Sequence, residues 1–353
     1  MINLFRPYVT EEAIEQVSKV LCSPCITQGS KVDLFEWEFA NLFKVDNPIS
    51  VNSGTSALEI AYDLIGLKKG DEVITTPLTC AATNIPLLHR GVKIVWADIL
   101  EDTLCINPVD VRSKITEKTK AVVQVHLGGV GADVGNVHKP VVSDACQALG
   151  IFTGDYTCCS FQAIKHITTG DGGMLVVNDI EKYHKAKLMR WFGIDRCRPI
   201  VKEWQSYRTR MMNFDIEVLG GKKHMNDIAA TLGLIGLTQY SAILEYRRKQ
   251  FNLYKRLLEG IEGIKIVDGK ANTYWLFTVL VERRDDFAKM LFDADIECNV
   301  VNVRNDVYKI FGGKKADLPI LASIEDKYVC LPIGMHVTEE DVEYICRQIR
   351  KGW

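Results

Sequence analysis

The sequence predicts an α/β protein built on a mostly parallel sheet that helices cover on both faces. From about residue 48, short apolar and β-branched runs alternate with helical or turn-rich segments. The length of 353 residues suits one large and one smaller domain, and we expect them at residues 1–235 and 236–353. The composition (47% hydrophobic, 25% charged, net charge −2) is typical of a globular protein, and it argues against a dedicated nucleic-acid or membrane-surface binder.

Two helices are expected before the first strand. Thr10 and the two glutamates after it form a helix start, and a second helix follows a loop at residues 26–30. The expected inward-facing positions are Ile14, Val17, Val20 and Leu21 in the first helix and Phe35, Phe39 and Phe43 in the second.

Six apolar, β-branched runs are expected to form strands of the large sheet. They lie at residues 72–76, 93–97, 121–125, 141–143, 158–161 and 173–177, and a further short apolar run at residues 49–51 precedes them.

The C-terminal part is expected to form a smaller α+β domain. A long helix begins near Asn226 and runs to about Glu259, linking the two domains. Strands at residues 264–267 and 274–281 and a helix at residues 285–293 follow it. The last helix has Thr338 as its N-cap and Asp341 at the third helical position, which is a capping-box pattern.

Lys165 is the most informative residue of the chain. It lies between two runs expected to be buried strands, residues 158–161 and 173–177, with a glycine cluster after it. An arbitrary lysine is most often a solvated surface residue, but a lysine between buried strands is costly unless it has a function. Asp144 lies one strand and loop upstream. A lysine that bonds to the cofactor aldehyde and a carboxylate that keeps the ring nitrogen protonated are what a pyridoxal phosphate (PLP) enzyme needs.

A phosphate site is expected at the start of the helix that follows the first strand. Gly54 lets the backbone approach closely, and Thr55 and Ser56 add hydroxyls beside the free N–H groups of a helix start. Alone, this pattern is equally consistent with an ordinary capped helix. Together with Asp144 and Lys165 in chain order, it predicts the site of the cofactor phosphate.

Several motifs along nearly the whole chain resemble one enzyme family. They are Ile26-Thr-Gln-Gly29, Asn52-Ser-Gly-Thr-Ser-Ala-Leu58, Pro77-Leu-Thr-Cys-Ala-Ala-Thr83, Ser143-Asp-Ala-Cys-Gln147, Ser160-Phe-Gln-Ala-Ile-Lys165, Lys222-Lys-His-Met-Asn-Asp227 and Leu331-Pro-Ile333. In these motifs the chain resembles the DegT/DnrJ/EryC1/StrS family, which comprises PLP-dependent nucleotide-sugar aminotransferases of fold-type I. The resemblance implies a large domain with a mostly parallel seven-stranded sheet and a smaller C-terminal domain.

The resemblance also implies roles for individual residues. Lys165 would bond to PLP, and Asp144 would contact the pyridine nitrogen. Gln147 would lie near the cofactor 3-hydroxyl, while Cys80 stands where an aromatic ring often stacks on the cofactor. The residues implied to hold the phosphate are Gly54, Thr55, Ser56, Ser160 and, from the second subunit of a homodimer, Lys222.

The implied activity is transamination of a nucleotide-linked keto-sugar with L-glutamate as the donor. The region from Lys222 to Asp227 resembles members that make 4-amino-4,6-dideoxy sugars from 4-keto-6-deoxyhexoses. A C3-specific aminotransferase, a PLP-dependent sugar dehydratase and a non-catalytic PLP-binding regulator are the alternatives. The presence of Lys165 argues against the dehydratase, because the related dehydratases carry histidine there.

Three further residues are candidates for contacting the substrate. His126 follows a strand at the sheet edge where ligands bind, and His166 adjoins Lys165, but a packed structural histidine is an equal alternative for each. Arg304 is a candidate for pairing with the sugar-linked diphosphate, the alternative being a solvated loop arginine. A nicotinamide dehydrogenase is set aside, because residues 128–133 lack the required glycine spacing.

The cysteines point to reduced thiols in a cytoplasmic protein. There are eleven, an odd number, and most lie in apolar segments, so we do not expect a disulfide framework. Cys22 and Cys25 have the spacing of half a zinc site or of a redox pair, but no second pair matches them. We therefore expect no metal site. The N-terminal residues lack the pattern of a signal peptide, which is the basis for the expected location.

Overall fold

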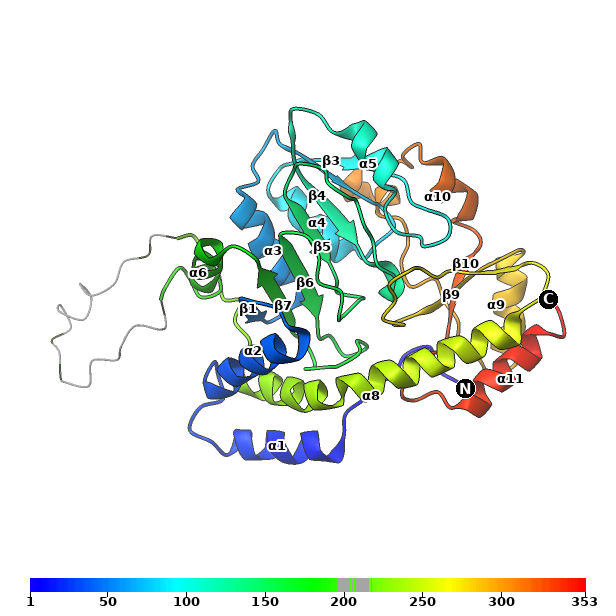
Figure 1. Ribbon diagram of the computed structural model, residues 1–353, viewed down its shortest axis with the longest axis horizontal. Helices are drawn as coiled ribbons and strands as arrows, with labels where there is room; N and C mark the ends of the chain where they lie inside the picture. Colours follow the sequence, from blue (N-terminus) through cyan, green and yellow to red (C-terminus); the bar gives the residue numbers. More distant parts are fainter. Residues whose placement is uncertain (196–203, 205, 207–215, 217) are drawn as a thin grey trace.

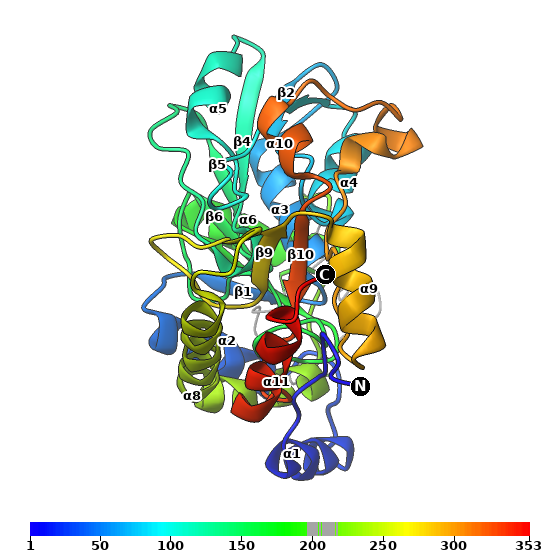
Figure 2. The same ribbon diagram turned by 90° about the vertical axis from the view of Figure 1, so that its right-hand side faces the viewer.

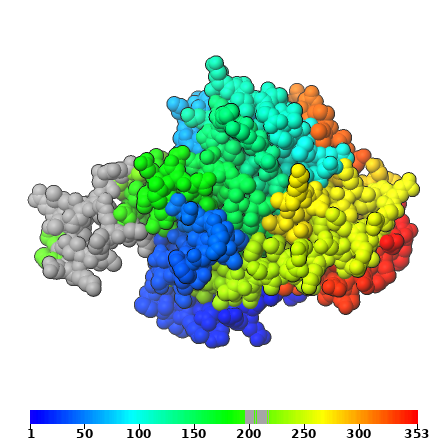
Figure 3. All heavy atoms as spheres, in the orientation of Figure 1, coloured from blue at the N-terminus to red at the C-terminus, as the bar shows by residue number. Residues whose placement is uncertain are grey.

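The computed structural model describes residues 1–195, 204, 206, 216 and 218–353. A central sheet lies above the long helix α8 (Asp227–Leu258), which extends from the large sheet to the C-terminal elements (Figure 1). The two chain ends both lie at the C-terminal side of the molecule, as the view turned by 90° also shows (Figure 2). The space-filling view shows the N-terminal helices packed beside α8 (Figure 3).

The large sheet has seven strands and is mostly parallel, as the sequence predicts. Its order is β1-β7-β6-β5-β4-β2-β3, and β7 alone runs antiparallel to its neighbours, β1 and β6. The strands are β1 (Pro48–Val51), β2 (Glu72–Thr75), β3 (Lys93–Trp96), β4 (Thr119–Val125), β5 (Val141–Asp144), β6 (Tyr156–Ser160) and β7 (Gly173–Val177). Each expected strand is confirmed to within two residues.

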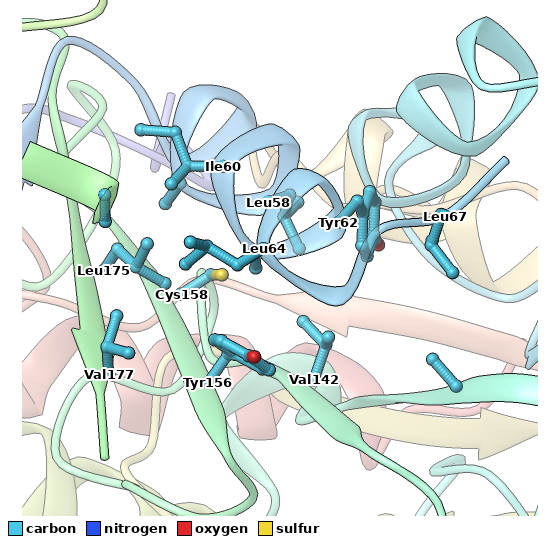
Figure 4. Close-up of a cluster of buried hydrophobic side chains, with 14 of the residues drawn as sticks. Leu58, Ile60, Tyr62, Leu64, Leu67, Val142, Tyr156, Cys158, Leu175 and Val177 are labelled. Carbon is cyan, nitrogen blue, oxygen red and sulfur yellow. The ribbon is translucent and has the colours of Figure 1, made fainter. Parts of the chain in front are cut away.

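Alternating side chains of the sheet enter two separate cores. On one face, helix α3 (Gly54–Ile65) covers Cys158, Leu175 and Val177, and Figure 4 shows Leu58 and Leu64 of this helix lying over them. On the other face, α2 (Ser30–Phe43) and α8 cover Cys159, Met174 and Val176. Alternate side chains of β6 and β7 point to opposite faces of the sheet, so these two strands contribute residues to the cores on both faces. The other helices are α1 (Glu11–Leu21), α4 (Ala81–His89), α5 (Pro108–Lys114) and α6 (Ile180–Met189).

The C-terminal part forms a three-stranded antiparallel sheet with its own core. The order is β10 (Tyr328–Leu331), β9 (Phe277–Val281), β8 (Ile264–Ile266). Its core takes side chains from α8, α9 (Arg284–Asp293) and α11 (Glu339–Ile349). Helix α10 (Pro319–Ile324) and the short 3₁₀ turns η1 (Leu127–Gly129), η2 (Asn305–Val307) and η3 (Lys309–Phe311) are the remaining elements of the described residues.

Helix α8 joins the two parts without a linker. The boundary expected at residues 235 and 236 falls inside this helix. Helix α8 is long and apolar enough to pass the length and hydropathy test for a membrane span. Because it packs against α1, α2 and α11, it is a scaffold helix of this fold.

The helix starts predicted at Thr10 and Thr338 are confirmed, but one predicted apolar face is wrong. Thr10 caps α1, and Thr338 and Asp341 form a capping box at α11. In α1, however, Ala13 and Val20 are the buried residues, while Ile14 and Leu21 are 60% and 57% exposed. The helix therefore packs on α8 through a face rotated from the expected one, and a narrow contact with a single helix explains why so few of its apolar residues are covered.

All ten cysteines of the described part are free thiols, and Cys197 lies outside it. The expected buried cysteines Cys105, Cys158, Cys159, Cys330 and Cys346 are buried. In the described ranges, no cluster of three His, Cys, Asp or Glu side chains suitable for a metal ion occurs.

Candidate active site

Lys165 lies in the connection between the antiparallel strands β6 and β7, as predicted. The connection is folded back on itself, because Thr169 N donates to Phe161 O (2.9 Å) and Lys165 N donates to Gln162 O (2.9 Å). The lysine side chain is half-buried, and its Nζ lies 3.9 Å from the ring centroid of Trp275. Burial lowers the pKa of Lys165, and this effect is opposed by the nearby Cys146, Cys80 and Asp144.

Asp144 ends strand β5, and its carboxylate is held in place from two sides. Oδ2 accepts a 2.6 Å hydrogen bond from the Thr83 hydroxyl, and Oδ1 accepts one of 3.1 Å from Cys146 N. Thr83 in turn is hydrogen bonded to Thr79 (2.8 Å) at the start of α4. The electrostatic coupling between Asp144 and Lys165 places both groups in one site. A fixed, buried carboxylate is suited to holding a proton on a heterocyclic nitrogen.

The start of helix α3 has the local geometry expected of a phosphate cradle. Ser53 is the N-cap, and its Oγ accepts from Ser56 N (3.1 Å), while Ser56 Oγ donates to Asn52 Oδ1 (2.7 Å). The first intrahelical hydrogen bond is Ala57 N to Ser53 O, so the N–H groups of Gly54 and Thr55 precede it. Unbonded N–H groups at the positive end of a helix are suited to an anion.

Gly54 is required by close packing around this cradle. A Cβ at Gly54 would lie 2.7 Å from Cys146 Sγ and 3.0 Å from Ser160 Cβ. The contact brings the start of α3 against the end of β6 and the loop after β5, next to Asp144. The predicted phosphate residues Gly54, Thr55, Ser56 and Ser160 are thus brought together by the fold.

Gln147 and Cys80 lie at the edges of the same site. Gln147 is buried, with Oε1 accepting from Gly128 N (2.9 Å) and Nε2 facing Asn302 Oδ1 (3.5 Å). Cys80 is exposed at the N-cap position of α4, and its electrostatic effect on Lys165 places it near the lysine. The amide of Gln147 is therefore fixed by the protein, whereas Cys80 faces open space.

The backbone of Lys222 contacts Asn52, which precedes the phosphate cradle of the same chain. Its carbonyl accepts from Asn52 Nδ2 (3.3 Å), and Lys223 O accepts from Asn52 N (2.8 Å). The side chain of Lys223 pairs with Glu59 of α3, whereas Lys222 is exposed. The described residues thus place an exposed lysine next to Asn52, at the entrance to the phosphate cradle.

Both candidate histidines are buried and hydrogen bonded within the protein, which favours the structural alternative that the sequence left open for each. Nδ1 of His126 accepts from Ala132 N (2.8 Å), so the neutral ring donates from Nε2 to Thr153 Oγ1 (3.2 Å). Nε2 of His166 donates to Thr273 O (2.7 Å). Burial lowers the pKa of His126 to about 4 and that of His166 to about 3, so both rings are neutral near pH 7. Each histidine thus links segments of the protein through hydrogen bonds of its ring.

Arg304 is bonded to carboxylates of the protein, so the solvated-loop alternative is wrong, while its pairing with the sugar-linked diphosphate stays a prediction. It is only 4% exposed, so it is not a solvated loop arginine. Its guanidinium forms a two-point ion pair with Asp306 (2.8 and 2.7 Å) and a further one with Glu325 (2.7 Å). A diphosphate would have to displace both carboxylates.

Two residues of the site were not predicted from the sequence. Thr83 contacts Asp144, and Trp275 contacts Lys165. The position of Thr83 could have been inferred from the sequence. It lies four residues after Thr79 at the start of a helix that follows a parallel strand, so both hydroxyls share one helix face near the sheet edge. Trp275 had none, because it comes from the C-terminal part, far from Lys165 in sequence.

The arrangement fits the expected cofactor. PLP needs a nearby amine, an acid for its ring nitrogen and a cradle for a dianionic phosphate. Lys165, Asp144 and the start of α3 supply these from three separate segments, packed against one another through Gly54 and Cys146. PLP would be held by these groups, with Thr83 fixing the acid.

Comparison with known proteins gives the same result over nearly the whole chain. The model of the DegT/DnrJ/EryC1/StrS aminotransferase family matches residues 7–350. The GDP-perosamine synthase of Escherichia coli O157:H7 is 28% identical, with 99% of this chain and 98% of that protein covered. The dTDP-4-dehydro-2,3,6-trideoxy-D-glucose 4-aminotransferase of Saccharopolyspora spinosa is 28% identical, with 84% and 82% covered.

Solved structures agree with the fold. The crystal structure of AtS13 from Actinomadura melliaura superposes with a TM-score of 0.92 at 32% identity, covering 100% of this chain and 99% of that one. The expected arrangement, a mostly parallel sheet with helices on both faces, is therefore the fold-type I architecture.

Proposed function

We propose that this chain, a member of the DegT/DnrJ/EryC1/StrS aminotransferase family, acts on a nucleotide-linked 4-keto-6-deoxyhexose. Its family and its structural likeness make it a PLP-dependent sugar aminotransferase of amino-sugar biosynthesis. L-Glutamate is the proposed donor, and the product is a 4-amino-4,6-dideoxy sugar nucleotide. The observation that carries the proposal is the joint placement of Lys165, Asp144 and the phosphate cradle. The name of the relative from Saccharopolyspora spinosa, a 4-aminotransferase of a 4-dehydro sugar nucleotide, supports amination at C4.

Each residue of the site has a distinct proposed role in the reaction. When bound, PLP supplies an electron sink that takes an amino group from a donor and passes it to a keto-sugar. Lys165 removes and returns the proton at the reacting carbon, and the burial that lowers its pKa increases the fraction of neutral amine available for this. Asp144 would hold a proton at the ring nitrogen of bound PLP, and Thr83 and Cys146 N fix its carboxylate. Gly54 and Thr55, at the start of α3, would bind the phosphate through their backbone N–H groups.

The proposal is tested by absorbance spectroscopy of the protein with PLP. Native protein should develop the yellow absorbance of lysine-bound PLP and lose it on addition of L-glutamate. Lys165→Ala is the matched control, in which the yellow band should not form. Each glutamate that gives its amino group to the cofactor must leave as one 2-oxoglutarate. The amount of 2-oxoglutarate released is therefore measured alongside the absorbance and should equal the amount of cofactor converted.

The choice of sugar is tested by incubating the amine-loaded protein with 4-keto and 3-keto sugar nucleotides. Recovery of the yellow band with the 4-keto substrate alone would support the proposal. Recovery with 3-keto sugars alone would identify a C3 aminotransferase. Loss of a sugar hydroxyl without amine transfer would identify a dehydratase, and no reaction of the glutamate-treated protein would favour a PLP-binding regulator.

We further propose a cytoplasmic homodimer in which Lys222 reaches the phosphate of the partner's cofactor. The exposure of the Lys222 side chain supports this assignment, because an exposed side chain can extend towards a second subunit. Mixing inactive Lys165→Ala and Lys222→Ala subunits should restore about a quarter of the native activity, because about half of the dimers are mixed and half of their sites are intact. No recovery on mixing, with both variants folded and dimeric, would place Lys222 in the site of its own chain.

A further inference from the structure

Lys165 has an aromatic partner where an ion pair would be expected. Its Nζ lies 3.9 Å from the ring centroid of Trp275, within the distance of about 6 Å over which a cation is attracted to a ring face. Among the described residues, no carboxylate lies within ion-pair distance of this amine. Tryptophan has the ring that binds cations most strongly. The indole face therefore lies in direct contact with the amine and can stabilise its positive charge, in addition to the attraction from the nearby Cys146, Cys80 and Asp144.

The indole ring is held rigidly by contacts on several sides. Its Nε1 donates to Ile164 O (3.0 Å), which belongs to the residue directly before Lys165. Phe5 stacks on the ring with centroids 5.6 Å apart and an interplanar angle of 23°. Trp275 is 1% exposed, and the next residue is fixed by Leu276 N donating to Gly128 O (2.9 Å). The ring is thus fixed relative to the backbone that carries the lysine.

We propose that Trp275 is a positioning residue for Lys165, and that its indole face binds the protonated amine whenever this amine is not bonded to the cofactor. The inference rests on the proposed role of Lys165 as the lysine that bonds PLP. The ring would keep Nζ close to the site during the part of the cycle in which the amine is released. It would also determine how readily the amine gives up its proton.

The alternative role for Trp275 is an apolar wall that merely excludes water. The two roles have opposite effects on the pKa of Lys165. Cation binding by the ring stabilises the ammonium and raises the pKa, so removing the ring lowers it further. Exclusion of water destabilises the ammonium, so removing a wall would raise the pKa. Measuring the pKa in ring variants therefore separates the two roles.

The experiment is competitive labelling of Lys165 with trace acetic anhydride in the full-length protein freed of cofactor, over a range of pH and read by mass spectrometry. The midpoint of the pH profile gives the pKa, and the plateau at high pH reports access of the reagent. In Trp275→Leu we expect the midpoint to fall by about one pH unit, and in Trp275→Phe by less, since a benzene ring binds cations more weakly. The midpoint for Lys182 serves as an internal reference.

Phe5→Leu is the matched control, because Phe5 contacts the indole but not the amine. It should leave the midpoint of Lys165 unchanged. An unchanged or higher midpoint in Trp275→Leu would overturn the inference, as would an equal decrease in Phe5→Leu. If Trp275→Leu does not fold, Trp275→Phe alone decides by the direction of its change. Because no sugar or donor is used, failure of the proposed aminotransferase reaction would leave this result readable.

Discussion

Lys165 and Arg304 are two cations that sequence reasoning placed in the site, and the structure gives them opposite surroundings. Lys165 is half-buried against an indole face, and no described carboxylate pairs with it. Arg304 is buried between Asp306 and Glu325, with hydrogen bonds to both carboxylates. Burial lowers the pKa of Lys165, whereas the pKa of Arg304 is raised by its two acidic partners against the effect of burial.

The difference teaches how a reactive cation is distinguished from a structural one. A buried cation is stable when carboxylates neutralise it, and it then has no capacity left for a ligand. A buried lysine without a carboxylate partner has a lowered pKa, so it gives up its proton more readily, as proton transfer requires. The four predictions below test this comparison, from the largest expected effect to the smallest.

Lys165→Arg should abolish aminotransferase activity while leaving the fold intact. Arginine keeps the positive charge over Trp275 but has no neutral amine at accessible pH. We expect a loss of roughly 10³-fold or more in kcat, measured by 2-oxoglutarate release, with little change in Tm. Retention of more than a tenth of the activity would show that charge alone suffices and would break the comparison.

Arg304→Met should destabilise the protein strongly without a specific effect on substrate binding. The change leaves the fully buried Asp306 without its ion-pair partner, and loss of one partner of a buried pair costs about 3–5 kcal/mol. Urea unfolding measures the free energy. Lys327→Met, which removes the exposed pair with Glu282, is the control, with an expected cost of at most about 1 kcal/mol. Normal stability with a raised KM for the sugar nucleotide would instead restore Arg304 as a substrate contact.

His166 sharpens the comparison, because it adjoins Lys165 and yet is structural. Burial lowers its pKa to about 3 from an ordinary value of 6.5, so between these values the unfolded chain binds a proton that the folded chain does not. The free energy of unfolding therefore decreases as the pH falls from 6.5 towards 3. At pH 5, His166 alone lowers it by about 2 kcal/mol. Unfolding free energies at pH 7 and pH 5 should differ less in His166→Gln than in the native chain. Equal differences would mean that His166 is accessible to protons in the folded state.

Thr83→Val should weaken the site modestly. It removes the 2.6 Å hydrogen bond to Asp144 while keeping the shape of the side chain. A hydrogen bond to a charged group contributes about 1.5–3 kcal/mol, so we expect a loss of roughly tenfold or more in PLP affinity, measured by titration of the yellow band. Thr79→Val, which reaches Asp144 only through Thr83, is the control and should lose less. A larger loss in Thr79→Val would show that the acid is not positioned through Thr83.

Sequence patterns predicted the parts of the fold that depend on local periodicity. The alternation in β6 and β7 and the capping residues Thr10 and Thr338 gave the correct elements, because each depends on neighbouring residues. The buried face of α1 was wrong because the partner helix α8, more than 200 residues away, selects which apolar residues are covered.

The sequence by itself determined the chemical groups of the site and their order: a glycine and hydroxyls at a helix start, then Asp144, then Lys165. These could be recognised because a helix start, a strand end and a turn are local features. Only the tertiary structure decided which polar side chains remain available. His126, His166 and Arg304 are occupied by Ala132, Thr273 and Asp306, and Lys165 meets Trp275, through contacts that join distant segments or bend back within a loop. Hydrogen bonding and charge neutralisation in a buried site depend on what packs there, which no local pattern specifies.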